Sequence, residues 1–136
     1  MSLSDTKAKK LQTGRIAIIY LCVSMFCGMF SAIYEHFSHG VYSDFMVYLF
    51  MFPLAGGTLP FTAIGLINKL PFPTPAAKRS YNSGIASFTT GSCIKGILDI
   101  YGTSSGYTSV YWVAGVLLVC AGLSSYICQI YSRVKN

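Results

Sequence analysis

Four apolar stretches, each close to the length of a membrane-spanning helix, constrain the fold of this chain more than any other feature. They cover residues 16–34, 45–67, 82–101 and 109–131, and the third is the most polar of the four. The hydrocarbon core of a bilayer is about 30 Å thick, and an α-helix crosses it with about 20 residues. We therefore predict an all-α integral membrane protein, a four-helix bundle with short outer loops, formed by residues 16–131.

The composition argues against an ordinary water-soluble domain. Of the 136 residues, 53% are hydrophobic and 10% are charged, and the mean hydropathy is +0.54. Soluble domains usually carry about 25% charged residues. The apolar residues are too abundant and too continuous for one soluble core, so we expect the lipid bilayer to be the main partner of the chain.

The basic residues predict the orientation of the four helices. Nine of the ten lysines and arginines lie in the N-terminal segment 1–15, in the loop 68–81 or in the tail 132–136. These segments fall on one side of the predicted bundle, and short segments rich in Lys and Arg stay on the cytoplasmic side. We predict a multi-pass protein of the cell membrane with both termini in the cytoplasm, an extended proline-rich loop 68–81 and no nucleic-acid partner.

Two charged residues lie inside the third apolar stretch. Lys95 precedes Asp99 by four residues, and on a helical wheel both share a face with Ser92 and several glycines. Small residues on membrane helices normally face other helices, so we predict that Lys95 faces the interior of the bundle. Lys before Asp is the weaker order for an intrahelical pair, which makes Glu35 on another helix the first candidate partner of Lys95. A pair with Asp99 is the alternative.

These charges suggest a polar pocket near the outer side of the membrane. Lys95 would attract an anionic group, and the carboxylates would tune it or accept a cation. A purely structural ion pair is the competing interpretation. The candidate pocket residues are Lys95, Asp99, Glu35, Asp44, His36 and Ser92.

The second apolar stretch contains a predicted helix break. Pro53 and Pro60 each lack a backbone donor, and Gly56 and Gly57 loosen the helix between them. Broken helices inside a membrane are tolerated where the freed groups meet protein or water, and in transporters such breaks often form the substrate site. A simple kink that shapes the packing is the other interpretation.

The first outer loop contains the only two histidines, His36 and His39, with Glu35 and Asp44 nearby. These residue types bind transition metals. One short loop without a helical HxxxH spacing does not build a coordination geometry, so we predict no metal site and no cofactor.

Motifs for enzymatic chemistry are missing from the sequence. It contains no GxSxG, no HExxH, no P-loop and no dinucleotide-binding glycine set, which favours a function other than catalysis. We expect a small transporter-like or ligand-binding membrane protein, alone or as a homo-oligomer, with a ligand that the sequence does not identify. The alternative is an accessory or structural subunit of a larger membrane complex, whose small-residue faces bind the helices of a partner subunit.

Overall fold

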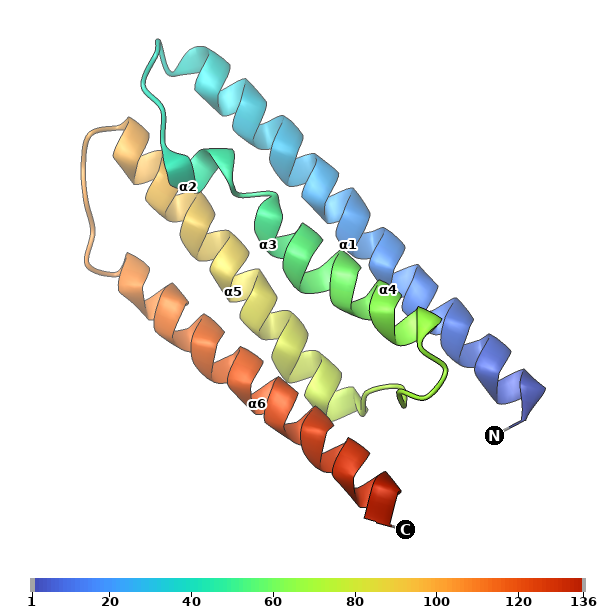
Figure 1. Cartoon of the computed structure of the whole chain (residues 1–136). Coiled ribbons are helices and arrows are strands. Elements are labelled where there is room, and N and C mark those ends of the chain that lie inside the picture. Colours follow the sequence, from blue (N-terminus) through green and yellow to red (C-terminus); the bar gives the residue numbers. More distant parts are fainter. Residues whose placement is uncertain (1, 136) are drawn as a thin grey trace.

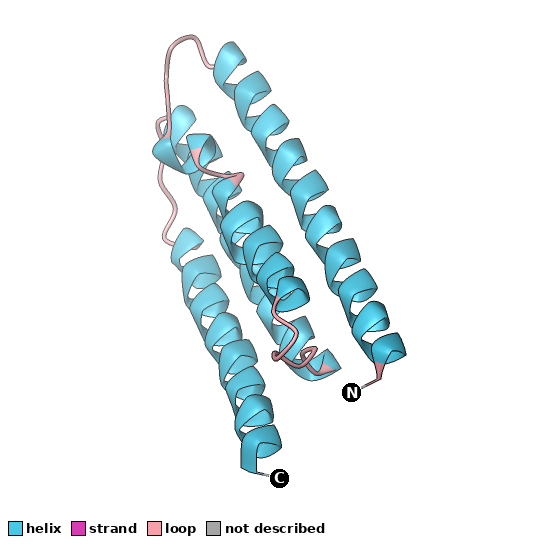
Figure 2. Cartoon of the chain, turned by 45° about the vertical axis from the view of Figure 1, so that its right-hand side comes forward, coloured by secondary structure: helices cyan, strands magenta, loops and turns pink. Residues whose placement is uncertain are grey.

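The computed structural model describes residues 2–135, and all regular elements in this range are helices (Figures 1 and 2). The predicted all-α fold is therefore confirmed. Both termini and the connection 67–74 lie at one end of the molecule, and the connections 38–43 and 101–107 lie at the other. The elements are α1 (Leu3–Phe37), α2 (Asp44–Val47), α3 (Met51–Pro53), the π-helix η1 (Leu54–Thr58), α4 (Leu59–Leu66), α5 (Pro75–Ile100) and α6 (Thr108–Lys135).

Two helices, α1 and α6, are long and apolar enough to cross a membrane. α5 has the length but is less apolar, and the stretch 45–67 is divided among several short elements. The structure thus confirms two of the four predicted spans as candidate membrane helices. The four-span bundle stays a prediction.

Residues 3–15 of the predicted N-terminal segment belong to α1 rather than forming a separate tail. The side chain of Ser2 accepts a hydrogen bond from the N–H of Asp5, and the Asp5 carboxylate accepts one from the N–H of Ser2. This capping box satisfies donors that a helix start leaves free. α1 therefore begins well before its apolar stretch.

The prediction of an extended loop over 68–81 is wrong in its second half, because α5 begins at Pro75. Thr74 is the N-cap residue, and its side chain accepts a hydrogen bond from the N–H of Ala77. Pro75 follows at the first helical position, where a proline costs no hydrogen bond. A proline of this connection therefore starts the next helix.

Within the apolar stretch 16–34, the buried face of α1 is more polar than its exposed face. Ser24 and Ser31 are buried there together with Ala17 and Cys27, and Lys9 and Thr13 are buried in the preceding part of α1. A surface helix of a water-soluble protein has the reverse arrangement, with apolar residues inside. The large apolar side chains of α1 are instead exposed, namely Leu11, Ile18, Ile19, Met25, Phe26, Met29 and Ile33.

The helical segments lie side by side in an open row (Figure 1). α1 packs on the segment α2–α4, which includes η1; that segment packs on α5, and α5 packs on α6. No Cα atom of α1 lies within 8 Å of one in α5 or α6. Short connections keep chain neighbours adjacent in space, as predicted, but α1 and α6 do not meet to close the bundle.

Glycines allow α5 and α6 to approach closely. A Cβ atom added to Gly84 would lie 2.8 Å from the backbone nitrogen of Val119, and one on Gly122 would lie 2.8 Å from that of Tyr81. Any larger residue would push the two backbones apart. Such small-residue contacts are typical of helices that pack in membranes.

The core lies toward the end of the molecule away from the termini. There Cys27 of α1 packs with Met46 and Leu49, which are almost completely buried. An aromatic cluster continues the packing from the second segment to α5 and α6; its members are Phe45, Phe52, Phe88 and Trp112. Two of the candidate site residues, Ser92 and Lys95, contact Phe45 of this cluster.

Candidate functional site

The break in the second segment is a π-helical turn, η1, which contains Gly56 and Gly57 and lies between Pro53 and Pro60. Pro60 has no N–H, so the carbonyl oxygen of Gly56 lacks its usual helical donor. The hydroxyl of Tyr81 on α5 donates to this oxygen at 2.7 Å. A neighbouring helix thus satisfies the backbone group that the proline leaves free.

Serines on both neighbouring helices donate to the irregular part of the same segment. On α1, Ser31 donates to the carbonyl oxygen of Met46 at 2.7 Å, and Ser24 donates to that of Phe50 at 2.9 Å. On α5, Ser92 donates to the carbonyl oxygen of Phe45 at 2.7 Å. Ser92, a predicted pocket residue, is completely buried in this contact. The interior polar side chains therefore hold the broken segment in place.

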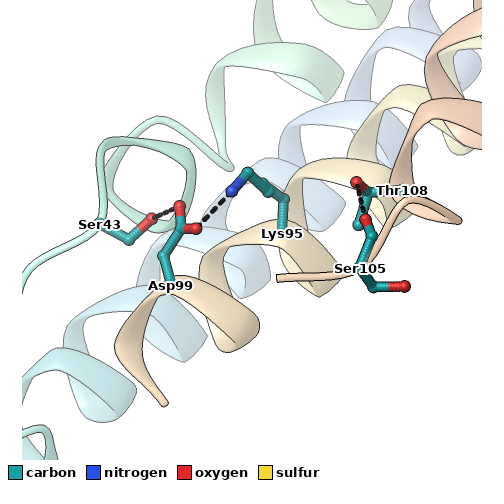
Figure 3. Close-up of polar contacts among 5 residues, drawn as sticks. All are labelled: Ser43, Lys95, Asp99, Ser105 and Thr108. Carbon is teal, nitrogen blue, oxygen red and sulfur yellow. Dashed lines mark hydrogen bonds and ion pairs between the residues drawn. The ribbon is translucent and has the colours of Figure 1, made fainter. Parts of the chain in front are cut away.

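Lys95 and Asp99 form an ion pair along one face of α5 (Figure 3). The Nζ atom of Lys95 lies 2.5 Å from Oδ1 of Asp99, and the hydroxyl of Ser43 donates to Oδ2 of Asp99 at 3.1 Å. The Nζ atom also lies 5.6 Å from the centroid of the Phe45 ring, a distance at which a cation is attracted to the ring face. The two charged side chains keep 29% and 27% of their surfaces exposed.

The first-choice prediction that Lys95 pairs with Glu35 is wrong. Within residues 2–135 the Lys95–Asp99 pair is the only ion pair closer than 4.0 Å. The i,i+4 spacing places both groups on one helix face, and Ser43 holds the carboxylate from its other oxygen. These local contacts outweigh the less favourable residue order.

The other predicted pocket residues, Glu35, His36 and Asp44, make no hydrogen bond or ion pair with Lys95 within residues 2–135. Oε1 of Glu35 is buried and has no hydrogen-bond partner in the described chain. His36 and Asp44 are exposed, as is His39, which adopts a left-handed φ of 55°. In residues 2–135, no three His, Cys, Asp or Glu side chains are grouped as a metal site would require.

A buried lysine outside the predicted site was missed by the sequence analysis. Lys9 is only 6% exposed, and its ammonium donates to the carbonyl oxygens of Ile67, at 3.0 Å, and Leu70. Burial lowers the pKa of Lys9 from its usual value of 10.5, because the charged form loses water. The sequence contained a signal for this burial, because Lys9 and Thr13 lie at helical spacing before the buried residues Ala17, Ser24 and Ser31.

The larger cavities of the described chain lie away from Lys95, Asp99 and Glu35. Three adjoining cavities of about 480, 290 and 270 Å³ form a groove along α1 and α5. Two others have volumes of about 430 Å³, on the surface of α1 around Gly14, and about 290 Å³, between α4 and α6. None of the predicted pocket residues Lys95, Asp99, Glu35, Asp44, His36 and Ser92 lines one of these cavities.

Comparison with protein-family models, with curated proteins and with solved structures finds no match to this chain. Fold alone does not identify function, and an open row of helices names no activity.

Proposed function

We propose that the chain is a polytopic protein of the cell membrane in which all four helical segments cross the bilayer. The support is the reversed polarity of α1, with hydroxyls and Lys9 inside and large apolar side chains outside. Such a surface is unfavourable in water and suited to lipid. Nine of the ten basic residues lie in the segments at the end that carries both termini, which supports a cytoplasmic location of that end.

The broken second segment is compatible with this placement. A membrane tolerates non-helical backbone only where its polar groups are satisfied by protein or water. Donation from Ser24, Ser31, Ser92 and Tyr81 meets this requirement at four carbonyl oxygens. Part of the polarity of α5 has the same explanation, because Tyr81 and Ser92 donate to the second segment, while Ser87 donates to the carbonyl oxygen of Tyr111 on α6.

Within the membrane, we propose an accessory or structural role, as a subunit of a larger membrane complex. One observation carries this proposal: most interior polar groups are already used within the chain, and within residues 2–135 only Oε1 of Glu35 and Oγ1 of Thr58 are buried side-chain atoms without a hydrogen-bond partner. The hydroxyl of Ser92 donates to the carbonyl oxygen of Phe45, and the ammonium of Lys95 is paired with Asp99, so both side chains already have partners. The open edges formed by α1 and α6 offer long faces to neighbouring helices.

A transporter-like or ligand-binding role is the second candidate. It is favoured by Oε1 of Glu35, a buried acceptor without a partner, and by the π-helical turn between Pro53 and Pro60. Buried acceptors without partners are rare in native structures, and π-helical turns often occur at functional sites. This role requires the outer half of the molecule to open around Glu35 and Lys95.

Cysteine accessibility in intact cells separates the two roles. In a background without the five native cysteines, Ser92→Cys and Lys95→Cys are treated with a membrane-impermeant thiol reagent. His39→Cys is the exposed outer control, and Lys7→Cys is the cytoplasmic control. The Ser92 variant leaves the Lys95–Asp99 pair intact, so its reactivity reports on the native packing.

The accessory role predicts labelling at position 39 and none at positions 92 and 95. Fast labelling at both 92 and 95 would overturn it in favour of a hydrated pocket. Labelling of position 7 in intact cells, or of position 39 only after permeabilisation, would overturn the proposed orientation. Release of the chain from membranes by alkaline carbonate would overturn membrane insertion itself.

A further inference from the structure

We infer that the groove between α1 and α5 binds one anionic phospholipid from the cytoplasmic leaflet, with its phosphate at Arg15 and Lys78. This inference rests on the proposed insertion and orientation of the chain. It concerns a surface that lies apart from the Lys95–Asp99 pair.

The three cavities adjoin one another along α1 and α5, because neighbouring cavities share lining residues. The cavity of about 480 Å³ shares Ile16 and Lys78 with its neighbour of about 290 Å³. That neighbour shares Tyr20, Val23 and Asn82 with the third cavity, of about 270 Å³. A single elongated molecule that passes over the Tyr20–Asn82 hydrogen bond would contact all three.

The mouth of the groove is basic and lies at the predicted cytoplasmic interface. Arg15 and Lys78 both line the first cavity, together with Gln12, and no acidic residue lines any of the three. The Nζ atom of Lys78 lies 5.5 Å from the centroid of the Phe72 ring, and Arg15 makes no hydrogen bond or ion pair within residues 2–135. Two cations that line one cavity match a phosphate group.

The rest of the groove matches an acyl chain in composition and length. Beyond the mouth, the walls include Ile19, Val23, Pro53 and Ala86. On α5 the lining runs from Lys78 to Thr90, which is about 18 Å at 1.5 Å per residue. One leaflet of the hydrocarbon core is about 15 Å deep, so the groove reaches from the interface to the middle of the bilayer.

Asn82 supplies a polar contact just below the mouth. Its Oδ1 atom accepts a hydrogen bond from the Tyr20 hydroxyl at 2.9 Å, and its amide group has no partner within residues 2–135. The amide lies along the path from the phosphate position to the apolar walls, where a phospholipid has its ester carbonyl groups. It is placed to donate a hydrogen bond to one of them.

The test uses the full chain in mild detergent, titrated with phosphatidylglycerol or phosphatidylcholine of identical acyl chains and followed by native mass spectrometry. We expect phosphatidylglycerol to bind more tightly. Each basic residue near an anionic surface contributes about 1 kcal/mol, so Arg15→Gln/Lys78→Gln should weaken phosphatidylglycerol binding by about 30-fold. Lys7→Gln/Arg79→Gln, which removes the same charge from exposed residues outside the groove, should leave it nearly unchanged.

Two further measurements distinguish the lipid from free phosphate. Ala86→Trp, which fills the apolar part of the groove from an exposed position, should weaken the binding of both lipids. Glycerol phosphate, which lacks acyl chains, should not displace phosphatidylglycerol at equal concentration. Displacement, or an unaffected Ala86→Trp variant, would overturn the acyl-chain assignment.

The outcomes also separate this inference from the proposed function. Equal affinity for the two lipids, or equal losses in the groove and control variants, would overturn the inference while leaving membrane insertion intact. Release of the chain by alkaline carbonate would overturn both. Circular dichroism of each variant verifies that its helices are retained.

Discussion

The hydroxyl of Tyr81 donates a hydrogen bond to the carbonyl oxygen of Gly56 at 2.7 Å, at the point where Pro60 withholds the usual helical donor. A side chain on α5 thereby compensates for a missing backbone group on the neighbouring segment. This relationship explains how a segment with two prolines can remain within the helical row.

The Tyr81→Phe variant tests this compensation. It should lower the free energy of unfolding by about 1–3 kcal/mol, because the carbonyl oxygen of Gly56 loses its side-chain donor while partly buried. Unfolding by dodecyl sulfate in mixed micelles, followed by circular dichroism, measures the change. Tyr107→Phe, at an exposed position, is the matched control, and an equal effect of the two changes would contradict the assigned role.

Close packing of α5 on α6 predicts opposite effects of alanine at two helical glycines. Gly84→Ala places a Cβ 2.8 Å from the backbone nitrogen of Val119 and should destabilise the protein by about 1–3 kcal/mol. Gly14→Ala in α1 meets nothing within 4 Å and should stabilise it by about 0.5–1 kcal/mol. The same unfolding assay checks both, and a stabilising Gly84→Ala would refute the close approach of these helices.

A double-mutant cycle tests the ion pair between Lys95 and Asp99. Both side chains are more than one quarter exposed, so solvent screening limits the coupling energy between Lys95→Met and Asp99→Asn to about 0.5–1 kcal/mol. A cycle of Lys95→Met with Glu35→Gln should give no coupling, since no ion pair joins these residues. A coupling energy between Lys95 and Glu35, with none between Lys95 and Asp99, would show that Glu35 is the partner of Lys95, as the sequence analysis first predicted.

Lys9 is expected to anchor the start of α1 to the connection after α4. Lys9→Met leaves the carbonyl oxygens of Ile67 and Leu70 without their charged donor and should cost about 1.5–3 kcal/mol. Lys7→Met, at an exposed position of the same helix, should cost much less. Comparable losses in the two variants would mean that general charge, rather than this contact, stabilises the helix start.

The pH dependence of the same pair of variants adds a second readout. Because burial lowers the pKa of Lys9 in the folded protein, the unfolded chain binds the proton more readily. The stability of the parent protein relative to Lys9→Met should therefore rise as the pH increases through the folded pKa toward 10.5. The Lys7→Met comparison should lack this trend.

Much of the fold could be predicted from local features of the sequence. The helical character of the apolar stretches and the irregularity between Pro53 and Pro60 both depend on residues close together in the chain. The extent of α5 was misjudged because Thr74 and Pro75 can end a loop as readily as they continue one. The candidate site was harder to predict, because its contacts depend on other segments of the chain. Ser92 donates to Phe45 of the second segment, whereas Oε1 of Glu35 is buried without a partner within residues 2–135.

By itself, the sequence determined where helices form and where the second one must break, since hydropathy and a missing proline N–H act within a few residues. Only the tertiary structure decided that Lys95 pairs with Asp99, that Lys9 is buried and that the row stays open between α1 and α6. Those outcomes depend on which side chains meet across helices. The packing of whole helix surfaces decides this. It must provide close contacts at glycines and, at the same time, donors for carbonyl groups that lack a helical hydrogen bond.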